Sequence, residues 1–294
     1  MDRKPEVMME RKEYFTFIVL HYNCFEETQA CVDSILALEH SDCVKIVVMD
    51  NASVNDSLGR LQEMYQSNEQ VYILHNEKNL GFSAGNNIAY DYAVKHWDSS
   101  FVVFANNDLL FRDREFIRKV RGEYEKSHFG ILSPDVFHTT LKIHQSPIDE
   151  NMVLPKNRVQ RTILFNTLAL WFYPLYYALL GKNSKDVALS VTDLSYRKNI
   201  APMGACLIFS GELMDCKPVI FSPETYFYYE EYILSFWCRK HNVDIVFQPD
   251  IQVLHNHGKA TKSLGDHRRV MKFRMKNILQ AAKVYYKLLK EEDI

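Results

Sequence analysis

Polar side chains follow four short apolar segments in the first part of this 294-residue chain. The Asp50 carboxylate can accept hydrogen bonds from a nucleoside base or from ribose hydroxyls. Asp108 can ligate Mg²⁺ or Mn²⁺ beside the oxygens of a diphosphate, because Mg²⁺ commonly takes only one or two protein carboxylates. Each group taken alone also fits an ordinary turn or helix cap. The four groups are His21, Tyr22 and Asn23; Asp50 and Asn51; His75 and Asn76; and Asn106, Asn107 and Asp108.

A glycine-containing segment between the third and fourth apolar runs indicates close contact with an anionic ligand. Gly81 and Gly85 let the backbone approach a ligand, and the start of the helix that follows favours negative charge. The segment also carries Asn79, Phe82 and Asn86. A loop followed by a capped helix explains the same residues without a ligand. The chain has neither the glycine fingerprint of dinucleotide-binding folds nor a P-loop, so a nucleotide must be held differently.

Alternating strands and helices must position these segments. The alternation predicts βαβ units and a mainly parallel, Rossmann-like sheet, in which ligands lie beyond the carboxyl ends of the strands. Strands are expected at 15–20, 44–49, 71–74 and 101–104, and helices at 26–38, 57–66 and 84–95. The later part is expected to add a strand at 206–209, a helix at 230–241, a strand at 244–247 and a helix at 266–290.

Composition places the chain among globular proteins and argues against nucleic-acid binding by bulk charge. Hydrophobic residues make up 47% of the chain and the net charge is −2, so no general attraction to phosphate backbones is expected. The charge is uneven, because residues 267–290 carry eight Lys and Arg and no Asp or Glu. The first residues are charged and lack the apolar core of a signal peptide, so no export is expected.

Two segments suggest contact with a membrane. Residues 163–181 are uncharged and near the minimum spanning length of about 18–20 residues. Asn166 and Pro174 interrupt them, which favours a buried or interfacial helical pair bent at Pro174 over a transmembrane span. The C-terminal helix has an apolar stripe flanked by basic residues, which predicts attachment to an anionic membrane surface; the alternative is docking on its own domain. The stripe consists of Met271, Met275, Ile278, Ala282 and Leu289.

Six runs in a fixed order resemble the family 2 glycosyltransferases with the GT-A fold, in particular the rhamnosyltransferase-like branch that builds bacterial surface polysaccharides. They extend from about Phe15 to Thr261, and their order makes the resemblance specific. The runs are VVMDNASVNDS, NEKNLGFSAGNNIA, VFANNDLLF, MGAC, FYYEE with Leu234 and Arg239, and VLHNHG. The resemblance implies an α/β fold built on one GT-A-type domain.

The resemblance also implies roles for particular residues. Asp50 corresponds to the acid that binds base and ribose, and Asp108 with His255 corresponds to a site for Mg²⁺ or Mn²⁺. Glu231 stands at the position of the general base, with Glu230 as the alternative one residue earlier. The other implied contacts to the donor are Tyr22, Asn23, Asn51, Asn79, Gly81, Phe82, Asn86 and Asn107, and those on the acceptor side are Gly204 and Ala205.

The implied reaction is an inverting transfer of rhamnose or a similar sugar from a dTDP- or UDP-sugar to a hydroxyl of a saccharide acceptor. A divalent cation neutralises the leaving diphosphate in such a reaction, and a carboxylate deprotonates the attacking hydroxyl. The acceptor is expected to be lipid-linked, and the protein is expected in the cytoplasm, peripheral at the inner face of the cell membrane.

The expected domain organisation follows from the element pattern and the resemblance. The GT-A domain covers 1–262, and a basic amphipathic helix covers 263–294. Within the domain we expect a nucleotide-sugar-binding half at about 15–110, a helical insertion at about 145–199 and an acceptor half at about 200–262.

Two alternatives stay open. A sugar nucleotidyltransferase shares the nucleotide-binding layout, but the Gly-rich basic loop that it needs after the first strand is absent. A non-catalytic scaffold is conceivable, because Asn106 stands where many relatives have an acid and Glu231 replaces the usual Asp. The retention of Asp108, Glu231 and His255 together favours an enzyme.

Overall fold

The computed structural model describes residues 14–181, 190–256 and 266–291 of the chain. Its first part alternates strands and helices as predicted, with element ends shifted by a few residues. These elements are β1 (Tyr14–His21), α1 (Phe25–Leu36), the short helix η1 (Ser41–Cys43), β2 (Val44–Asp50), α2 (Ser57–Tyr65), β3 (Val71–His75), α3 (Gly81–His96) and β4 (Ser99–Asn106). The predicted βαβ pattern is confirmed.

The later part contains the expected elements and several that were not predicted. The expected ones are β9 (Cys206–Ser210), α8 (Glu230–Lys240), β10 (Ile245–His255) and α9 (His267–Glu291). The additional ones are β5 (Leu109–Leu110), α4 (Phe116–Ser127), β6 (Ile131–His138), β7 (Ile143–His144), β8 (Arg197–Lys198) and α7 (Gly211–Cys216). The expected insertion contains α5 (Lys156–Trp171), α6 (Tyr173–Tyr176) and η2 (Tyr177–Gly181).

The strands of the described chain form a mixed sheet rather than the mainly parallel one that the sequence predicted. The main order is β3-β2-β1-β4-β9-β6-β10-β5. β9 runs antiparallel between β4 and β6, so β1 to β4, β6 and β10 all point in the same direction. The short strands β5, β7 and β8 pair antiparallel with β10 or β6. The carboxyl ends of six strands therefore lie along one edge of the sheet, as a parallel arrangement requires.

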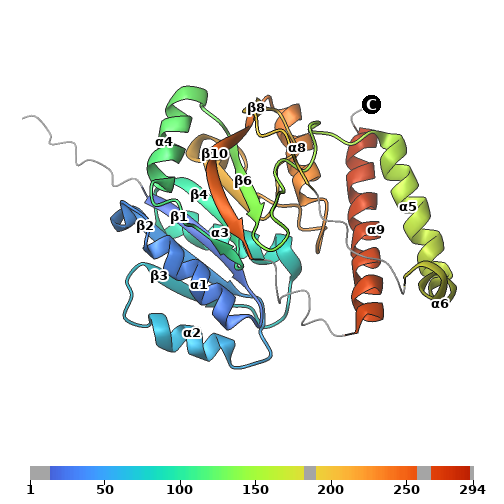
Figure 1. Cartoon of the computed structure of the whole chain (residues 1–294), viewed down its shortest axis with the longest axis horizontal. Coiled ribbons are helices and arrows are strands. Elements are labelled where there is room, and N and C mark those ends of the chain that lie inside the picture. Colours follow the sequence, from blue (N-terminus) through green and yellow to red (C-terminus); the bar gives the residue numbers. More distant parts are fainter. Residues whose placement is uncertain (1–13, 182–189, 257–265, 292–294) are drawn as a thin grey trace, which may run out of the picture.

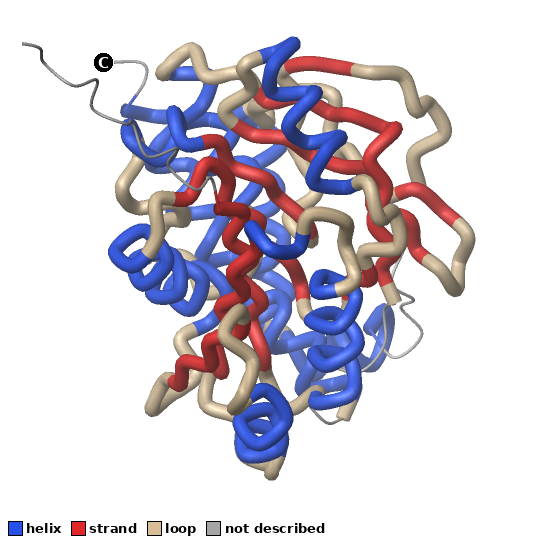
Figure 2. The backbone as a smooth tube through the Cα atoms, turned by 90° about the vertical axis from the view of Figure 1, so that its left-hand side faces the viewer, coloured by secondary structure: helices blue, strands red, loops and turns tan. Residues whose placement is uncertain are grey.

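Helices cover both faces of this sheet, as Figures 1 and 2 show. α1, α2 and α4 bury apolar side chains in one core cluster, and α3, α7 and α8 bury theirs in a second cluster. β1 contributes Phe17 to the first cluster and Ile18 to the second, because successive side chains of a strand point to opposite faces. Burial of this apolar surface on both sides makes the sheet a rigid support for the loops at its edge.

The C-terminal helix α9 packs against α5, and Figure 1 shows this pair standing beside the sheet. Members of the predicted apolar stripe point inward: Met275, Ala282 and Leu289 are buried in clusters with α5, α6 and α8. The assignment of this stripe as the membrane-binding surface is therefore wrong, because the domain itself covers it. The eight basic side chains of α9 are exposed.

The insertion is a bent helical pair, as expected. Within the described ranges no single helix is long and apolar enough to cross a membrane. Lys156–Trp171 and Tyr173–Gly181 reach that length and composition only together, and they meet at an angle of 97°. The bend lies at Phe172, just before α6, and Pro174 occupies an early position in α6 where its missing N–H is tolerated.

Tyr285 anchors α9 to the helix that carries the two adjacent glutamates. Its side chain is fully buried, and its ring centroid lies 5.7 Å from that of Tyr229 and 6.2 Å from that of Phe236. Its hydroxyl accepts the Leu154 N–H at 3.1 Å. The packing of α9 against α8 therefore depends on this ring.

We predict that Tyr285→Ala lowers the free energy of unfolding by about 3–5 kcal/mol, because it leaves a cavity and an unpaired N–H. Tyr286→Ala, at the half-exposed neighbour, is the control and should cost about 1 kcal/mol. Urea denaturation followed by circular dichroism measures both values. Equal costs for the two variants would contradict the anchoring role of Tyr285.

Candidate active site

Asp108 and His255 are far apart in the sequence but adjacent at the carboxyl edge of the sheet. His255 Nε2 lies 3.1 Å from Asp108 Oδ1. Strand pairing brings them together, since β5 follows Asp108 directly and pairs with β10 so that Leu109 stands opposite His255. The N–H of Asn256 also donates to the Asp108 carbonyl at 2.9 Å. The two residues expected to hold a metal are thus side by side.

Gln145 orients the imidazole of His255, a role that the sequence did not indicate. His255 is buried, and its Nδ1 lies 3.0 Å from Gln145 Oε1. Where Nδ1 donates a proton to that oxygen, Nε2 presents a lone pair to the Asp108 carboxylate. His255 Nε2 and Asp108 Oδ1 are both acceptors in that arrangement, and at 3.1 Å they would repel each other. A proton or a cation between the two atoms removes the repulsion.

Glu231 packs against the backbone of Gly204. A Cβ atom on Gly204 would overlap Glu231 Oε1, and the N–H of Gly204 donates to the Glu231 carboxylate. Gly204 and Ala205 lie just before β9, and the N–H of Asn106 donates to the Ala205 carbonyl at 2.9 Å. This bond ties the Gly204–Ala205 segment to the end of β4, two residues before Asp108. The segment expected on the acceptor side therefore connects Glu231 to the end of β4, close to Asp108.

Glu230 and Glu231 begin α8 as an acidic pair of unequal exposure. Glu230 is buried and Glu231 is half-buried. Burial, and then the charge of Glu231, raise the pKa of Glu230 to about 8. Burial also raises the pKa of Glu231, whereas N–H groups of Glu231 and Gly204 oppose this shift by hydrogen bonding to the carboxylate. Two adjacent carboxylates resist ionising together. The more exposed Glu231 is the one placed to ionise and to reach a substrate.

Asn51 and Asn79 shape the donor loop, residues 76–81, which leads into α3. The Asn51 amide donates to Asn79 Oδ1 at 3.1 Å and to the Gly81 carbonyl at 3.0 Å, and its oxygen accepts the Leu80 N–H at 2.9 Å. Asn79 Oδ1 also accepts the Tyr226 hydroxyl at 2.7 Å. Gly81 has a φ of 78°, and a Cβ atom there would overlap Tyr226. Three residues predicted to touch the donor therefore hold the loop in shape.

Asp50 belongs to a buried histidine–aspartate group. Its carboxylate is inaccessible, accepts the Ser53 N–H at 3.2 Å and lies 2.8 Å from His75 Nδ1. His21 Nε2 lies 3.8 Å from Asp50 Oδ1. Burial lowers the pKa of His21 to about 4 although the charge of Asp50 raises it, so His21 is neutral at pH 7. His75 is the half-exposed member of this group, so it is the side chain that a nucleoside can reach in this conformation.

The turn after β1 is bound to the turn after β2. Asn23 has a φ of 60°, its N–H donates to Ser53 Oγ at 2.8 Å, and its side-chain oxygen accepts the Val54 N–H at 2.8 Å. Tyr22, beside it, is half-buried. Of these two predicted donor contacts, Asn23 is engaged in holding the turns together.

The side chains of Phe82, Asn86 and Asn107, also predicted to contact the donor, point toward other parts of the protein. The Phe82 ring lies 5.2 Å from the ring of Phe221, and the buried Asn86 side chain donates to the Phe82 carbonyl at 3.0 Å. Asn107 is buried and donates to Thr28 Oγ1 at 2.9 Å. These side chains fix the donor loop and the end of β4 rather than face solvent. Their assignment as direct ligands of the donor stays a prediction.

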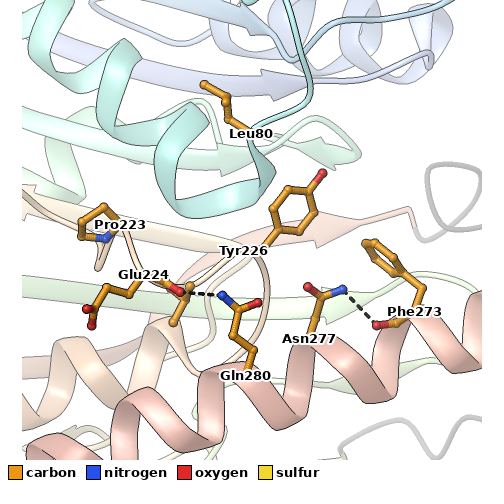
Figure 3. Close-up of a pocket in the computed structure, with 8 residues that line it drawn as sticks. Leu80, Pro223, Glu224, Tyr226, Phe273, Asn277 and Gln280 are labelled. Atoms are coloured by element: carbon orange, nitrogen blue, oxygen red, sulfur yellow. Dashed lines mark hydrogen bonds between the residues drawn. The ribbon is translucent and has the colours of Figure 1, made fainter. Parts of the chain in front are cut away.

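A cavity of about 330 Å³ lies between the donor loop and α9. Figure 3 shows Leu80 and Tyr226 on one side of it and Phe273 and Gln280 on the other. The Gln280 amide donates to the Glu224 carbonyl at 3.0 Å, which ties α9 to the segment that precedes α8. Leu80 of the donor loop lines the cavity, but Asp108, His255, Glu230 and Glu231 do not.

The sheet carries three features at its carboxyl edge: the loop of residues 76–81, the Asp108–His255 pair and the half-buried Glu231 carboxylate. This arrangement is typical of a GT-A-type glycosyltransferase. The chain matches the family model described as Glycosyl transferase family 2 over residues 16–185. This match covers more than half of the chain, and the protein belongs to that family.

Similar proteins agree with this family. The chain is 22% identical over 257 residues to the low-salt glycan biosynthesis hexosyltransferase Agl10 of Haloferax volcanii, covering 87% of this chain and 71% of that protein. The structure of S. aureus TarS 1–349 in complex with UDP-GlcNAc is similar at a TM-score of 0.56 and 14% identity, covering 93% of this chain and 72% of that one. Another structure of S. aureus TarS is similar at a TM-score of 0.53 and 14% identity. The match covers 83% of this chain and 37% of that TarS chain. The predicted GT-A fold is confirmed.

We predict that Gly204→Ala lowers kcat by about 100-fold, because the added methyl displaces the Glu231 carboxylate by about an ångström. The free energy of unfolding should change little by comparison. Gly59→Ala is the matched control, since a Cβ atom there meets nothing within 4 Å. Steady-state transfer kinetics and thermal melting of both variants test the contact. A Gly204→Ala enzyme with the kcat of Gly59→Ala would remove Glu231 from the site.

Proposed function

We propose that the protein is an inverting glycosyltransferase that transfers a hexose, rhamnose or a similar sugar, from a UDP- or dTDP-sugar to a hydroxyl of a saccharide. The observation that carries the proposal is the meeting of Asp108, His255 and the Glu231–Gly204 contact at one edge of the sheet. A TarS structure that holds UDP-GlcNAc has a similar fold, which supports a nucleotide-sugar donor.

The Asp108–His255 pair fits a divalent cation such as Mg²⁺ or Mn²⁺. In the described residues no group of three or more His, Cys, Asp or Glu surrounds a metal position. The fit rests on the facing acceptor atoms of the pair and on Gln145, which orients the imidazole from behind as the partners of metal-bound histidines do. With two protein ligands, further oxygens must come from the diphosphate or from water. Such a cation would neutralise the leaving diphosphate.

The protein side chains account for the remaining steps. Glu231 accepts the proton of the acceptor hydroxyl as the hydroxyl oxygen forms its bond to the anomeric carbon. The bond from that carbon to the diphosphate oxygen breaks, and the electron pair leaves with the diphosphate. Attack from the opposite face in a single displacement inverts the anomeric centre. Glu230, with its pKa raised by burial, keeps a proton at neutral pH and so leaves Glu231 free to ionise.

Two rival functions are less well supported. A sugar nucleotidyltransferase needs basic side chains on the loop after β1, where this chain has Tyr22 and Asn23. A non-catalytic scaffold does not require a carboxylate held against a glycine backbone beside the Asp108–His255 pair, which Glu231 and Gly204 provide. We further propose that the acceptor is lipid-linked and that the protein works in the cytoplasm, peripheral at the membrane, as part of surface polysaccharide synthesis.

We predict that Asp108→Ala abolishes divalent-dependent transfer, with a loss of at least about 1,000-fold, because the leaving charge is no longer neutralised. The fold should survive, since Asp108 lies in a half-buried turn and its backbone carbonyl still accepts the Asn256 N–H. Asp91→Ala, which removes an exposed carboxylate of α3, is the control. Transfer rates, thermal melting and Mn²⁺ binding in the presence of UDP measure the effect. Turnover and Mn²⁺ binding equal to those of Asp91→Ala would sink the metal assignment.

We predict that Glu231→Gln lowers kcat by about 10²–10⁴-fold while donor binding stays unchanged, because a general base is not needed to hold the nucleotide. The wild-type rate should fall as the pH drops, with a midpoint above the ordinary glutamate value of about 4.3, since burial raises the pKa of Glu231. Donor titration by calorimetry beside the pH–rate profile tests this. An active Glu231→Gln with an inactive Glu230→Gln would move the base one residue earlier.

A further inference from the structure

The hook, residues 156–181 (α5, α6 and η2), exposes an unusual amount of apolar surface. More than half of the large hydrophobic side chains exposed on the described chain belong to it. Trp171 is 78% exposed and Leu179 is 70% exposed. The full set is Leu164, Phe165, Leu168, Trp171, Phe172, Leu175, Leu179 and Leu180. Exposed apolar patches of this kind mark interaction surfaces.

The exposed side chains form a face of their own, distinct from the face that packs on the protein. Leu164, Leu168 and Trp171 recur at helical spacing along the outer side of α5. Val159 and Ala169 lie on the other side, buried in the clusters shared with α9. In Figure 1 α5 and α6 lie farthest from the sheet, beyond α9. The hook is therefore apolar on both sides, and only the inner side is covered by described parts of the chain.

The surroundings of this face are strongly cationic. The hook carries three Lys and Arg and no acid, and α9 carries eight Lys and Arg with Glu291 as its one acid. Some of these cations stand next to the hook, since Arg268 lies 5.5 Å from the centre of the Tyr177 ring and Lys272 lies 5.3 Å from that of Tyr173. A second copy of this chain would bring like charges together, whereas an anionic lipid surface would neutralise them.

An apolar groove of about 360 Å³ runs between α5 and α9 at the same end of the molecule. Ile163 and Leu164 line it, and Lys283 and Tyr286 stand at it from α9. Leu164 belongs both to this groove and to the exposed face. A groove with apolar walls and one ammonium group matches the acyl chain and phosphate of a phospholipid.

We propose that the outer face of the hook docks the protein on an anionic phospholipid bilayer without crossing it. The apolar side chains enter the boundary between headgroups and acyl chains, while the Lys and Arg of α5 and α9 contact the phosphates. The 97° bend turns η2 away from the axis of α5, so the two helices present a broad shallow wedge. This proposal extends the proposed function, because a lipid-linked acceptor lies in such a surface, but its test does not use sugar transfer.

The test is co-sedimentation of the full chain with vesicles of phosphatidylcholine alone and with about 30% phosphatidylglycerol added. The wild type should pellet with the anionic vesicles at low salt and be released by high salt. Replacing Trp171, Leu175 and Leu179 together by Ser should reduce vesicle affinity by about tenfold or more. The control replaces Met64, Leu141 and Val219 by Ser, which removes three exposed apolar side chains elsewhere on the protein.

Tryptophan fluorescence gives an independent measurement. Trp171 is exposed, whereas Trp97 and Trp237 are half-buried. Vesicle binding should therefore shift the emission to the blue, and Trp171→Phe should remove the shift while binding persists.

Four outcomes overturn the proposal. The first is equal vesicle binding by the hook variant and the control variant. The second is an absence of wild-type binding to anionic vesicles at low salt. The third is release by detergent alone, which indicates insertion. The fourth is a wild-type protein that is a dimer by light scattering and does not bind vesicles, together with a hook variant that is a monomer. That result would assign the face to a second copy of the chain. Transfer to a water-soluble acceptor should be unchanged in the hook variant, so failure here is distinct from failure of the proposed function.

Discussion

The reversed strand β9 is the constraint on which the site depends. Because it runs antiparallel between β4 and β6, the strands on both sides of it point the same way, and their carboxyl ends share one edge. The start of β9 reaches that same edge, which places Gly204 and Ala205 beside the end of β4. The short β5 then closes on the end of β10 and sets Asp108 against His255. A fully parallel sheet would have left Gly204 at the opposite edge.

Buried amides make the edge rigid. The side-chain NH₂ and oxygen of Asn51 both form hydrogen bonds with the donor loop. Asn79 Oδ1 in turn accepts the hydroxyl of Tyr226, from the second half of the chain. Asn87 adds a two-way bond to the backbone of Phe221, at 2.8 and 3.0 Å. A network of such hydrogen bonds favours one loop geometry, and a loop with one geometry loses little entropy when a nucleotide binds. These asparagines hold the backbone of residues 79–81 in one conformation.

Sequence alone predicted the strands and helices of the first half, because their apolar periods are strong and local. The resemblance also predicted one site with Asp108, His255 and Glu231. The structure brings Asp108 and His255 together, and the joint action of the three stays a prediction. Gln145, Tyr226 and Asn87 were missed because their importance lies in partners distant in the chain, which no spacing reveals. The inward direction of the α9 stripe was missed for a similar reason: an amphipathic pattern shows that a face is covered, not what covers it. The resemblance assigned Asn51, Asn86 and Asn107 to the donor but did not show that all three side chains are buried, because burial depends on the folded neighbours.

α9 links α8, which carries the acidic pair, to the hook and so couples their positions. On one side Tyr285 stacks among Tyr229, Tyr232 and Phe236 around the start of α8, where the acidic pair lies. On the other side Met275 packs with Ala169 and Tyr173 of the hook. Packed helices move as one body, because a close-packed interior resists deformation. A lipid surface bound at the hook would therefore hold Glu231 at a fixed height and orientation above the headgroups. An acceptor sugar on a lipid anchor reaches only a limited distance from the same surface, so the geometry of α9 would limit which hydroxyls of such an acceptor reach the base.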